Sequence, residues 1–167
     1  MALKLIPTHS LDAPIEVVLK DDDAWDVDRI EAERRDSKTQ EHAWDRWLVG
    51  ASRFDLRQVR HLLRDGAQPT VFRMRRLSLR EWQHVETVRE ANDRAGRMLA
   101  LRYALETIDV PTGEDSIRLD GPGSKSRMLT DEDMQALDDR GFRPYLEALA
   151  FAAWRASLDL TEFEKKA

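Results

Sequence analysis

The amino-acid sequence predicts a mainly α-helical fold with a minor β component. Two segments carry apolar residues at helical spacing, one from about Ser78 to Ile108 and one from Phe142 to Leu158. Two short segments, 15–19 and 70–76, have the β-branched or alternating apolar residues that are typical of strands. We therefore expect a long central amphipathic helix packed by a C-terminal helix, a small sheet or hairpin, and an extended N-terminal arm.

Residues 1–36 are predicted to form this extended acidic arm. Pro7 and Pro14 interrupt regular structure near the start, and only segment 15–19 has the pattern of a strand. From Asp21 to Asp36 there are eight acidic residues and three arginines, with one short polar helix expected over 26–35. Because few large apolar groups are available for packing, we expect the arm to lie on a partner or on a neighbouring copy.

Residues 37–167 are predicted to form a mainly helical domain. One of its helices begins at Asp55 and ends before Gly66, a residue type favoured just past a helix. Segment 70–76 follows as a strand with one wet, basic face. Because neither predicted strand is long enough to be stable alone, we expect it to pair with segment 15–19.

Capping signals place the remaining helices. Ser78 opens a capping box before the long helix, within which Gly96 marks a point of close packing. A loop is expected at about 110–129, where proline, glycine and serine gather, with a small hairpin around 117–119. Thr130 is the expected N-cap of another short helix, which precedes the alanine-rich C-terminal helix.

The motifs predict neither an enzyme nor a cofactor or metal site. The chain has no cysteine, so thiolate nucleophiles and cysteine-ligated metals are excluded. The acidic stretch does not fit the spacing of a calcium-binding loop, and the one glycine-, serine- and lysine-containing loop lacks phosphate-binding spacing. The histidines are scattered without metal-ligand or catalytic spacing, at His9, His42, His61 and His84.

The start of the chain lacks the apolar run of a signal peptide, and no stretch approaches the length of a membrane span. We therefore expect a cytoplasmic product with no membrane partner. Its net charge of −5 makes nucleic acid a possible but less favoured partner.

Charge segregation gives the sharpest functional hypothesis. Between Arg53 and Arg80 there are eight arginines and two aspartates, and four of these arginines share one face of the predicted helix. An ordinary solvated helix face is the alternative interpretation, and a GC-rich genome would also favour arginine. The hypothetical partner-binding residues are Arg53, Arg57, Arg60, Arg64, Arg73, Arg75, Asp21, Asp22, Asp23 and Trp25.

Tryptophan adds to the hypothesis, because tryptophan and arginine dominate the binding energy of many interfaces. The alternative is that the tryptophans belong to the core. We favour the core for Trp82 and Trp154, which fall at apolar positions of their helices. Trp25 stands among aspartates, and the sequence leaves both interpretations open for it.

Segments 69–82 and 129–166 resemble small structural and assembly proteins of tailed bacteriophages. In the first, Phe72, Arg75, Leu77 and Ser78 follow their pattern of a strand that runs into a helix. The resemblance covers roughly residues 69–109 and 129–166.

The resemblance implies a non-catalytic role in the virion, in the head, neck or head–tail junction. It also implies that the protein is in the host cytoplasm during assembly and in the virion afterwards. The implied partners are other virion or assembly proteins, including further copies of the chain. The alternatives are a tail assembly chaperone and, from another class, a small DNA-binding or regulatory protein that uses the arginine-rich helix.

Overall fold

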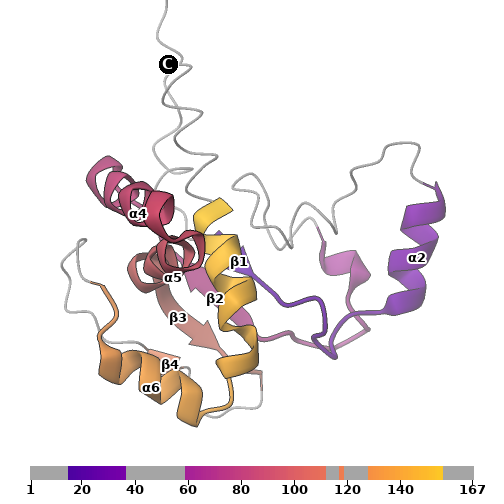
Figure 1. The fold of residues 1–167 in the computed structure, drawn as a ribbon. Helices are drawn as coiled ribbons and strands as arrows, with labels where there is room; N and C mark the ends of the chain where they lie inside the picture. The colour runs from indigo at the N-terminus through magenta and orange to yellow at the C-terminus, as the bar shows by residue number, and fades with distance from the viewer. Residues whose placement is uncertain (1–14, 37–58, 112–116, 119–127, 156–167) are drawn as a thin grey trace, which may run out of the picture.

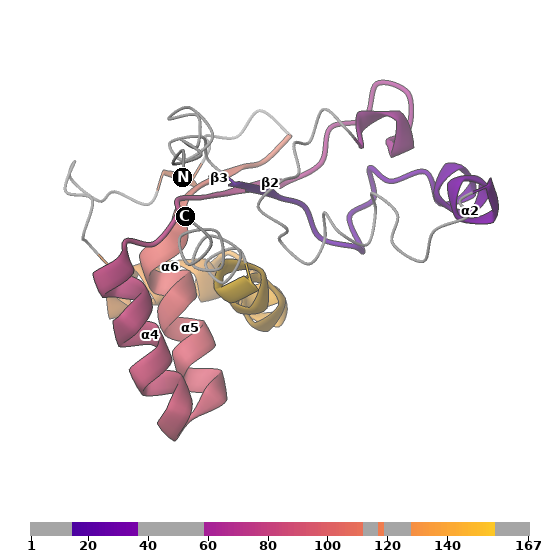
Figure 2. The ribbon, with the colours of Figure 1, turned by 90° about the horizontal axis from the view of Figure 1, so that it is seen from above.

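The computed structural model describes residues 15–36, 59–111, 117–118 and 128–155 (Figure 1). Its centre is a four-stranded antiparallel sheet in the order β1-β2-β3-β4. The helices α4, α5 and α6 lie on one side of this sheet (Figure 2). The fold is thus mainly helical with a small antiparallel sheet, as predicted.

The two predicted strands pair as expected. β1 (Ile15–Val17) and β2 (Val71–Met74) are antiparallel, with Val17 opposite Phe72. β3 (Leu105–Asp109) continues the sheet beside β2, with a register shift between Arg73 and Met74. β4 (Ile117–Arg118) pairs with β3, at the position of the expected small hairpin. The rest of that predicted loop lies largely outside the described residues.

The predicted single long helix is wrong. The segment instead forms α4 (Leu79–Ala91), α5 (Asp93–Ala104) and then β3, so that α4 and α5 lie side by side (Figure 2). Asn92 breaks the helix because its backbone is extended, with φ −153° and ψ 107°, and its side chain accepts a hydrogen bond from the Ala95 amide. The corner is therefore a C-cap and an N-cap at once.

The predicted capping box at Ser78 and the predicted N-cap at Thr130 are both confirmed, and Thr130 also forms a capping box. In each, the hydroxyl accepts a hydrogen bond from the backbone three residues on, and the acidic side chain there accepts one from the N-cap amide. Thr130 opens α6 (Asp131–Asp139). The C-terminal helix begins with the 3-10 turn η3 (Arg143–Tyr145) and is helical over 146–155. Its predicted end lies outside the described residues.

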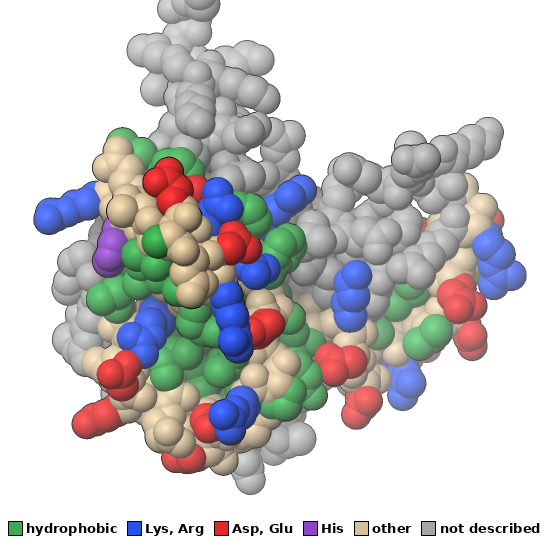
Figure 3. Space-filling model, in the orientation of Figure 1, with side chains coloured by type: hydrophobic (Ala, Val, Ile, Leu, Met, Phe, Trp, Pro, Cys, Tyr) green, Lys and Arg blue, Asp and Glu red, His purple; other side chains and the backbone are tan. Residues whose placement is uncertain are grey.

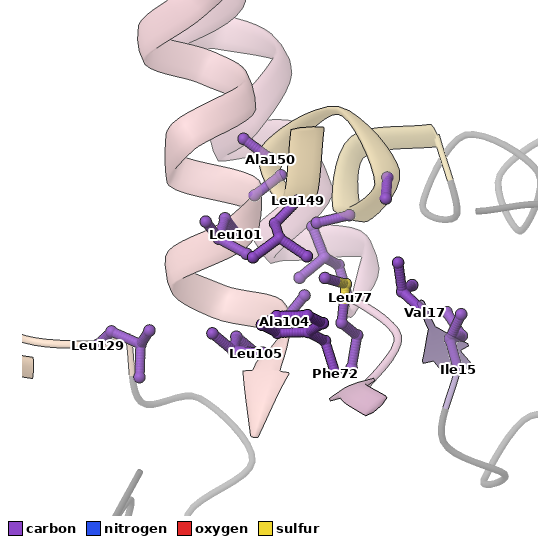
Figure 4. Packing of buried hydrophobic residues seen from close by; sticks show 14 of the residues in the cluster. Ile15, Val17, Phe72, Leu77, Leu101, Ala104, Leu105, Leu129, Leu149 and Ala150 are labelled. Carbon is purple, nitrogen blue, oxygen red and sulfur yellow. The ribbon is translucent and has the colours of Figure 1, made fainter. Parts of the chain in front are cut away.

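One hydrophobic cluster lies between the sheet and the helices, and we call this part of the molecule the body. Phe72, Met74 and Ile108 enter it from the sheet, and all three are fully buried. In Figure 4, Leu101 and Leu149 point toward one another between α5 and the C-terminal helix, with Phe72 on the sheet side. Trp82 and Trp154 pack against the same cluster, which confirms the core interpretation for both.

A second, smaller cluster belongs to residues 18–36 and 59–71, which we call the lobe. The lobe contains α2 (Val27–Asp36) and the 3-10 turn η2 (Arg60–Leu62). Figures 1 and 2 show α2 standing away from the helices of the body. Its buried side chains are Val18, Ala24, Trp25, Ile30, Val59, Leu62, Leu63 and Val71.

The prediction of an extended arm over residues 1–36 is wrong for residues 15–36, which are part of the sheet and the lobe. Residues 15–17 are a strand of the sheet, and residues 18–36 pack against 59–71. Trp25 is the largest apolar side chain of this cluster, and only 2% of its surface is exposed. Residues 1–14 lie outside the described residues.

Candidate interaction surface

The acidic turn Asp21–Asp23 leads from the sheet into the lobe. Asp22 fixes this turn: its carboxylate accepts hydrogen bonds from the Ala24 amide and from the Thr70 amide, each at 2.9 Å. Asp21 and Asp23 are exposed on either side of it. The predicted site residue Asp22 therefore has a structural role, which joins the two chain segments of the lobe, while its two neighbours face solvent.

Trp25 is buried and does not form a contact surface. Its indole nitrogen donates a hydrogen bond to the Leu19 carbonyl at 2.9 Å, and its backbone forms a bridge with Leu63. The ring lies in the lobe cluster, which settles the question that the sequence left open in favour of the core. A tryptophan that closes a small core is better explained by packing than by partner binding.

Arg29 clamps α2 onto the second segment of the lobe. Its guanidinium donates to the Leu63 carbonyl at 2.6 Å and to Asp65 at 2.9 Å, and it pairs with Asp26 at 3.3 Å. His61 and Glu33 add a second link at 3.2 Å. Sequence analysis missed the role of Arg29, because Leu63 and Asp65 lie more than thirty residues away and no local pattern joins them to it.

The helix face predicted to carry Arg53, Arg57, Arg60 and Arg64, which we call the arginine ridge, is only partly described. Arg53 and Arg57 lie outside the described residues. Arg60 and Arg64 are exposed, but the helix predicted to carry both ends at Leu62, so Arg64 is not on a helix face. The reason is strand-like pairing: the Arg64 amide donates to the Ala24 carbonyl at 2.8 Å, which holds the chain extended.

Arg73 lies on the open face of the sheet, where the strand prediction placed it. It pairs with Glu16 of β1 at 3.5 Å and with Asp109 of β3 at 2.7 Å. This face is therefore polar and partly exposed to solvent, as predicted, but Arg73 forms ion pairs with carboxylates of the same chain. The pairing reduces the positive charge that the sequence pattern suggested for this face.

Arg75 leaves the end of β2 and meets the start of α4. Its guanidinium forms a two-pronged pair with Glu81, at 2.9 and 2.6 Å. Burial raises the pKa of the Glu81 carboxyl, but hydrogen bonds from Arg75 and Ser78 outweigh it and hold this pKa below its ordinary value. Arg75 is thus a structural residue, and its predicted role toward a partner stays a prediction.

The other polar clusters also connect elements. His84 contacts the Tyr103 hydroxyl at 2.7 Å, between α4 and α5. Trp154 donates to Glu86 at 3.0 Å while Arg89 lies over its ring, which ties the C-terminal helix to α4. Within the described part of the chain, no group of three or more histidine or acidic side chains is placed to hold a metal ion.

Within the described residues, the outside of the lobe carries several exposed charged side chains, among them Asp28, Glu31 and Arg35. Figure 3 shows acidic side chains at the edge of the lobe where it leaves the body, and acidic and basic side chains interspersed over the visible faces of both lobe and body. No helix in the described segments is long and apolar enough to cross a membrane.

No protein-family model, curated protein or solved structure matches this chain.

Proposed function

We propose that this chain is a non-enzymatic structural or assembly protein of a tailed bacteriophage, which acts by protein–protein contacts in the head, neck or head–tail junction. The observation that carries the proposal is the projecting lobe. It has its own small core, separate from that of the body, and extended chain on either side joins it to β1 and β2. The resemblance of segments 69–82 and 129–166 to phage proteins supplies the biological setting.

The lobe suits docking because it is rigidly held and polar outside. Asp22 and Arg29 fix its two segments by several hydrogen bonds, so little conformational freedom is lost when a partner binds. The outward side of α2 carries exposed charged residues, among them Asp28, Glu31 and Arg35. Such a surface favours a charged partner and steers its approach.

A DNA-binding role has less support. Arg73 and Arg75 are engaged by Glu16, Asp109 and Glu81, which reduces the attraction of these two arginines for phosphates. The exposed Arg64 stands beside the acidic turn, and the net charge of the chain is −5. A nucleic-acid surface normally concentrates positive charge instead.

Mass spectrometry of purified phage particles tests the proposal. A structural component will be recovered from mature particles in amounts comparable to other minor virion proteins. If the chain is required for assembly but absent from finished particles, the tail assembly chaperone is the better description. If it is absent from the particles and its deletion leaves particle formation unchanged, the proposal is wrong.

A further inference from the structure

A groove of about 580 Å³ lies where the lobe meets the body, and we call it the lobe–body groove. Residues of the acidic turn and Arg64 line its lobe side, and aromatic residues of the body line the other. Phe142 and Tyr145 are half-buried there, and Phe142 packs edge-on against the buried Phe72 with ring centroids 5.7 Å apart. The groove thus has an aromatic wall anchored in the main core.

The opposite wall is acidic. Asp21 and Asp23 are exposed, and neither forms an ion pair with the residues that the structure describes. Asp22 contributes a third negative charge, although its oxygens already accept two backbone hydrogen bonds. Arg64 is the one cationic side chain among the described residues of the wall, so the wall has an excess of negative charge.

The same turn also lines a smaller hollow of about 300 Å³, together with residues of α2. That hollow adds Glu31 to the acidic residues and Lys20 to the basic ones. Acidic residues therefore outnumber basic ones in the lining of both hollows. An organic cation of a partner protein, such as a lysine or arginine side chain, complements this charge.

We infer that the lobe–body groove binds an extended segment of a partner protein in which a lysine or arginine adjoins a large apolar side chain. The basic group would meet Asp21 and Asp23, and the apolar group would pack on Phe142 and Tyr145. The groove volume lies in the range of sites that hold small ligands or a few side chains. Nucleic acid does not fit, because its phosphates would face the acidic wall. The inference rests on the proposed function, since it names the chemistry of a contact partner.

The test starts from a displayed library of short random peptides selected on the full-length chain. The most enriched peptide is then synthesised with a fluorescent label, and its Kd is measured by anisotropy for the parent and for variants. We expect enriched peptides that carry a basic residue beside an aromatic or aliphatic one. The variant pair Asp21→Asn and Asp23→Asn should weaken binding about tenfold or more, because charge-assisted hydrogen bonds are lost.

Tyr145→Ala probes the aromatic wall and should weaken binding by a similar factor. The matched control is Glu90→Gln with Glu132→Gln, which removes two exposed charges of α4 and α6 and should leave the Kd within about twofold. Because Asp21 and Asp23 are exposed, their double variant should keep the parent circular dichroism spectrum, and it decides the question if Tyr145→Ala fails to fold.

Three results would overturn the inference: no peptide is enriched, the enriched peptides lack basic residues, or the aspartate variants bind as tightly as the parent. The particle analysis described above is independent of these measurements. If the chain is found in virions but the groove variants do not change peptide binding, the proposed function stands and the proposed binding site does not. If the groove binds basic peptides but the chain is absent from particles, the binding site stands and the proposed function as a virion component does not.

Discussion

At the residue scale, Glu81 connects three parts of the chain. Its carboxylate accepts a hydrogen bond from the Ser78 amide at 2.9 Å and pairs with Arg75, although only 6% of the residue is exposed. It therefore completes the cap of α4 and fixes the exit of β2 against that helix. A buried carboxylate with this number of donors stabilises the fold only while it is charged.

Replacing Glu81 with glutamine should lower the free energy of unfolding by about 2–3 kcal/mol at neutral pH, because a buried charge pair is broken and Arg75 is left facing an amide. The measurement is urea denaturation followed by circular dichroism. Glu90→Gln is the matched control, since Glu90 is exposed on the same helix. Equal stability of the two variants would contradict the structural role of Glu81.

The pH dependence has a definite sign. The folded pKa of Glu81 lies below its ordinary value, so its stabilisation is fully present above an unfolded pKa of about 4.3 and is lost as the pH falls through the folded pKa. The parent should consequently lose more stability than Glu81→Gln between neutral and strongly acidic pH. Parallel curves for the two proteins would exclude Glu81 as a source of the acid sensitivity.

At the element scale, the hairpin of α4 and α5 explains both a success and a failure of sequence analysis. The apolar period from Ser78 onward is real, and Val85 and Leu101 are both buried as it predicted. The period alone cannot reveal the corner, since α4 and α5 bury the same apolar side against one core. Asn92 followed by Asp93 was the local signal for it, because asparagine is a favoured N-cap.

At Gly96, α5 packs tightly against Arg89 of α4. A Cβ atom placed there would lie 2.4 Å from the Cβ of Arg89 and 2.6 Å from its Cα. These are atoms close to the backbone, so a side chain at position 96 requires the two helices to separate. The sequence prediction of close packing at Gly96 is thereby confirmed.

Gly96→Ala should therefore destabilise the protein by about 1–3 kcal/mol, because overpacking exceeds the gain in helix propensity. Thermal unfolding of the parent and the variant measures the difference. Ala95→Gly at the neighbouring exposed position is the control, which should cost about 1 kcal/mol from propensity alone. A Gly96→Ala protein more stable than the parent would show that the helices can move apart without cost.

At the scale of the whole molecule, the division into lobe and body limited what sequence could predict. Local patterns located β1, β2, α2, α6 and the C-terminal helix, since each depends on a short stretch of chain. The lobe depends instead on contacts such as Asp22 with Thr70 and Arg29 with Asp65, which join distant segments. Nothing in the spacing of residues specifies such pairs, so the acidic segment resembled a free arm.

The candidate site was predicted only in part for the same reason. The acidic turn was recognised from its composition, and Asp21 and Asp23 are indeed exposed. Its aromatic counterpart, Phe142 and Tyr145, lies over a hundred residues further along, and only the folded chain brings the two walls together. Arg64 of the predicted helix face and Arg73 and Arg75 of the neighbouring strand were predicted to concentrate positive charge together, whereas the structure places them in three different environments.

Separate cores imply that the lobe can loosen while the body stays folded. Leu62 is 1% exposed in the lobe cluster and Leu137 is 1% exposed in the body cluster, so they form a matched pair. Each leucine-to-alanine change removes buried apolar surface and leaves a cavity, at a cost of about 2–5 kcal/mol. The lobe cluster is the smaller of the two. We therefore expect the cost of Leu62→Ala to exceed the free energy that stabilises the folded lobe.

Leu62→Ala should therefore speed hydrogen exchange of α2 about tenfold or more while α4 and α5 exchange as in the parent, whereas Leu137→Ala should affect the helices of the body. Hydrogen exchange with mass spectrometry of proteolytic peptides resolves the two regions. Under the proposed function, Leu62→Ala should also fail to enter phage particles despite its folded body, because a loosened lobe presents no fixed surface. If α2, α4 and α5 all lose protection together in Leu62→Ala, the molecule unfolds as one unit and the lobe is not a separable docking element.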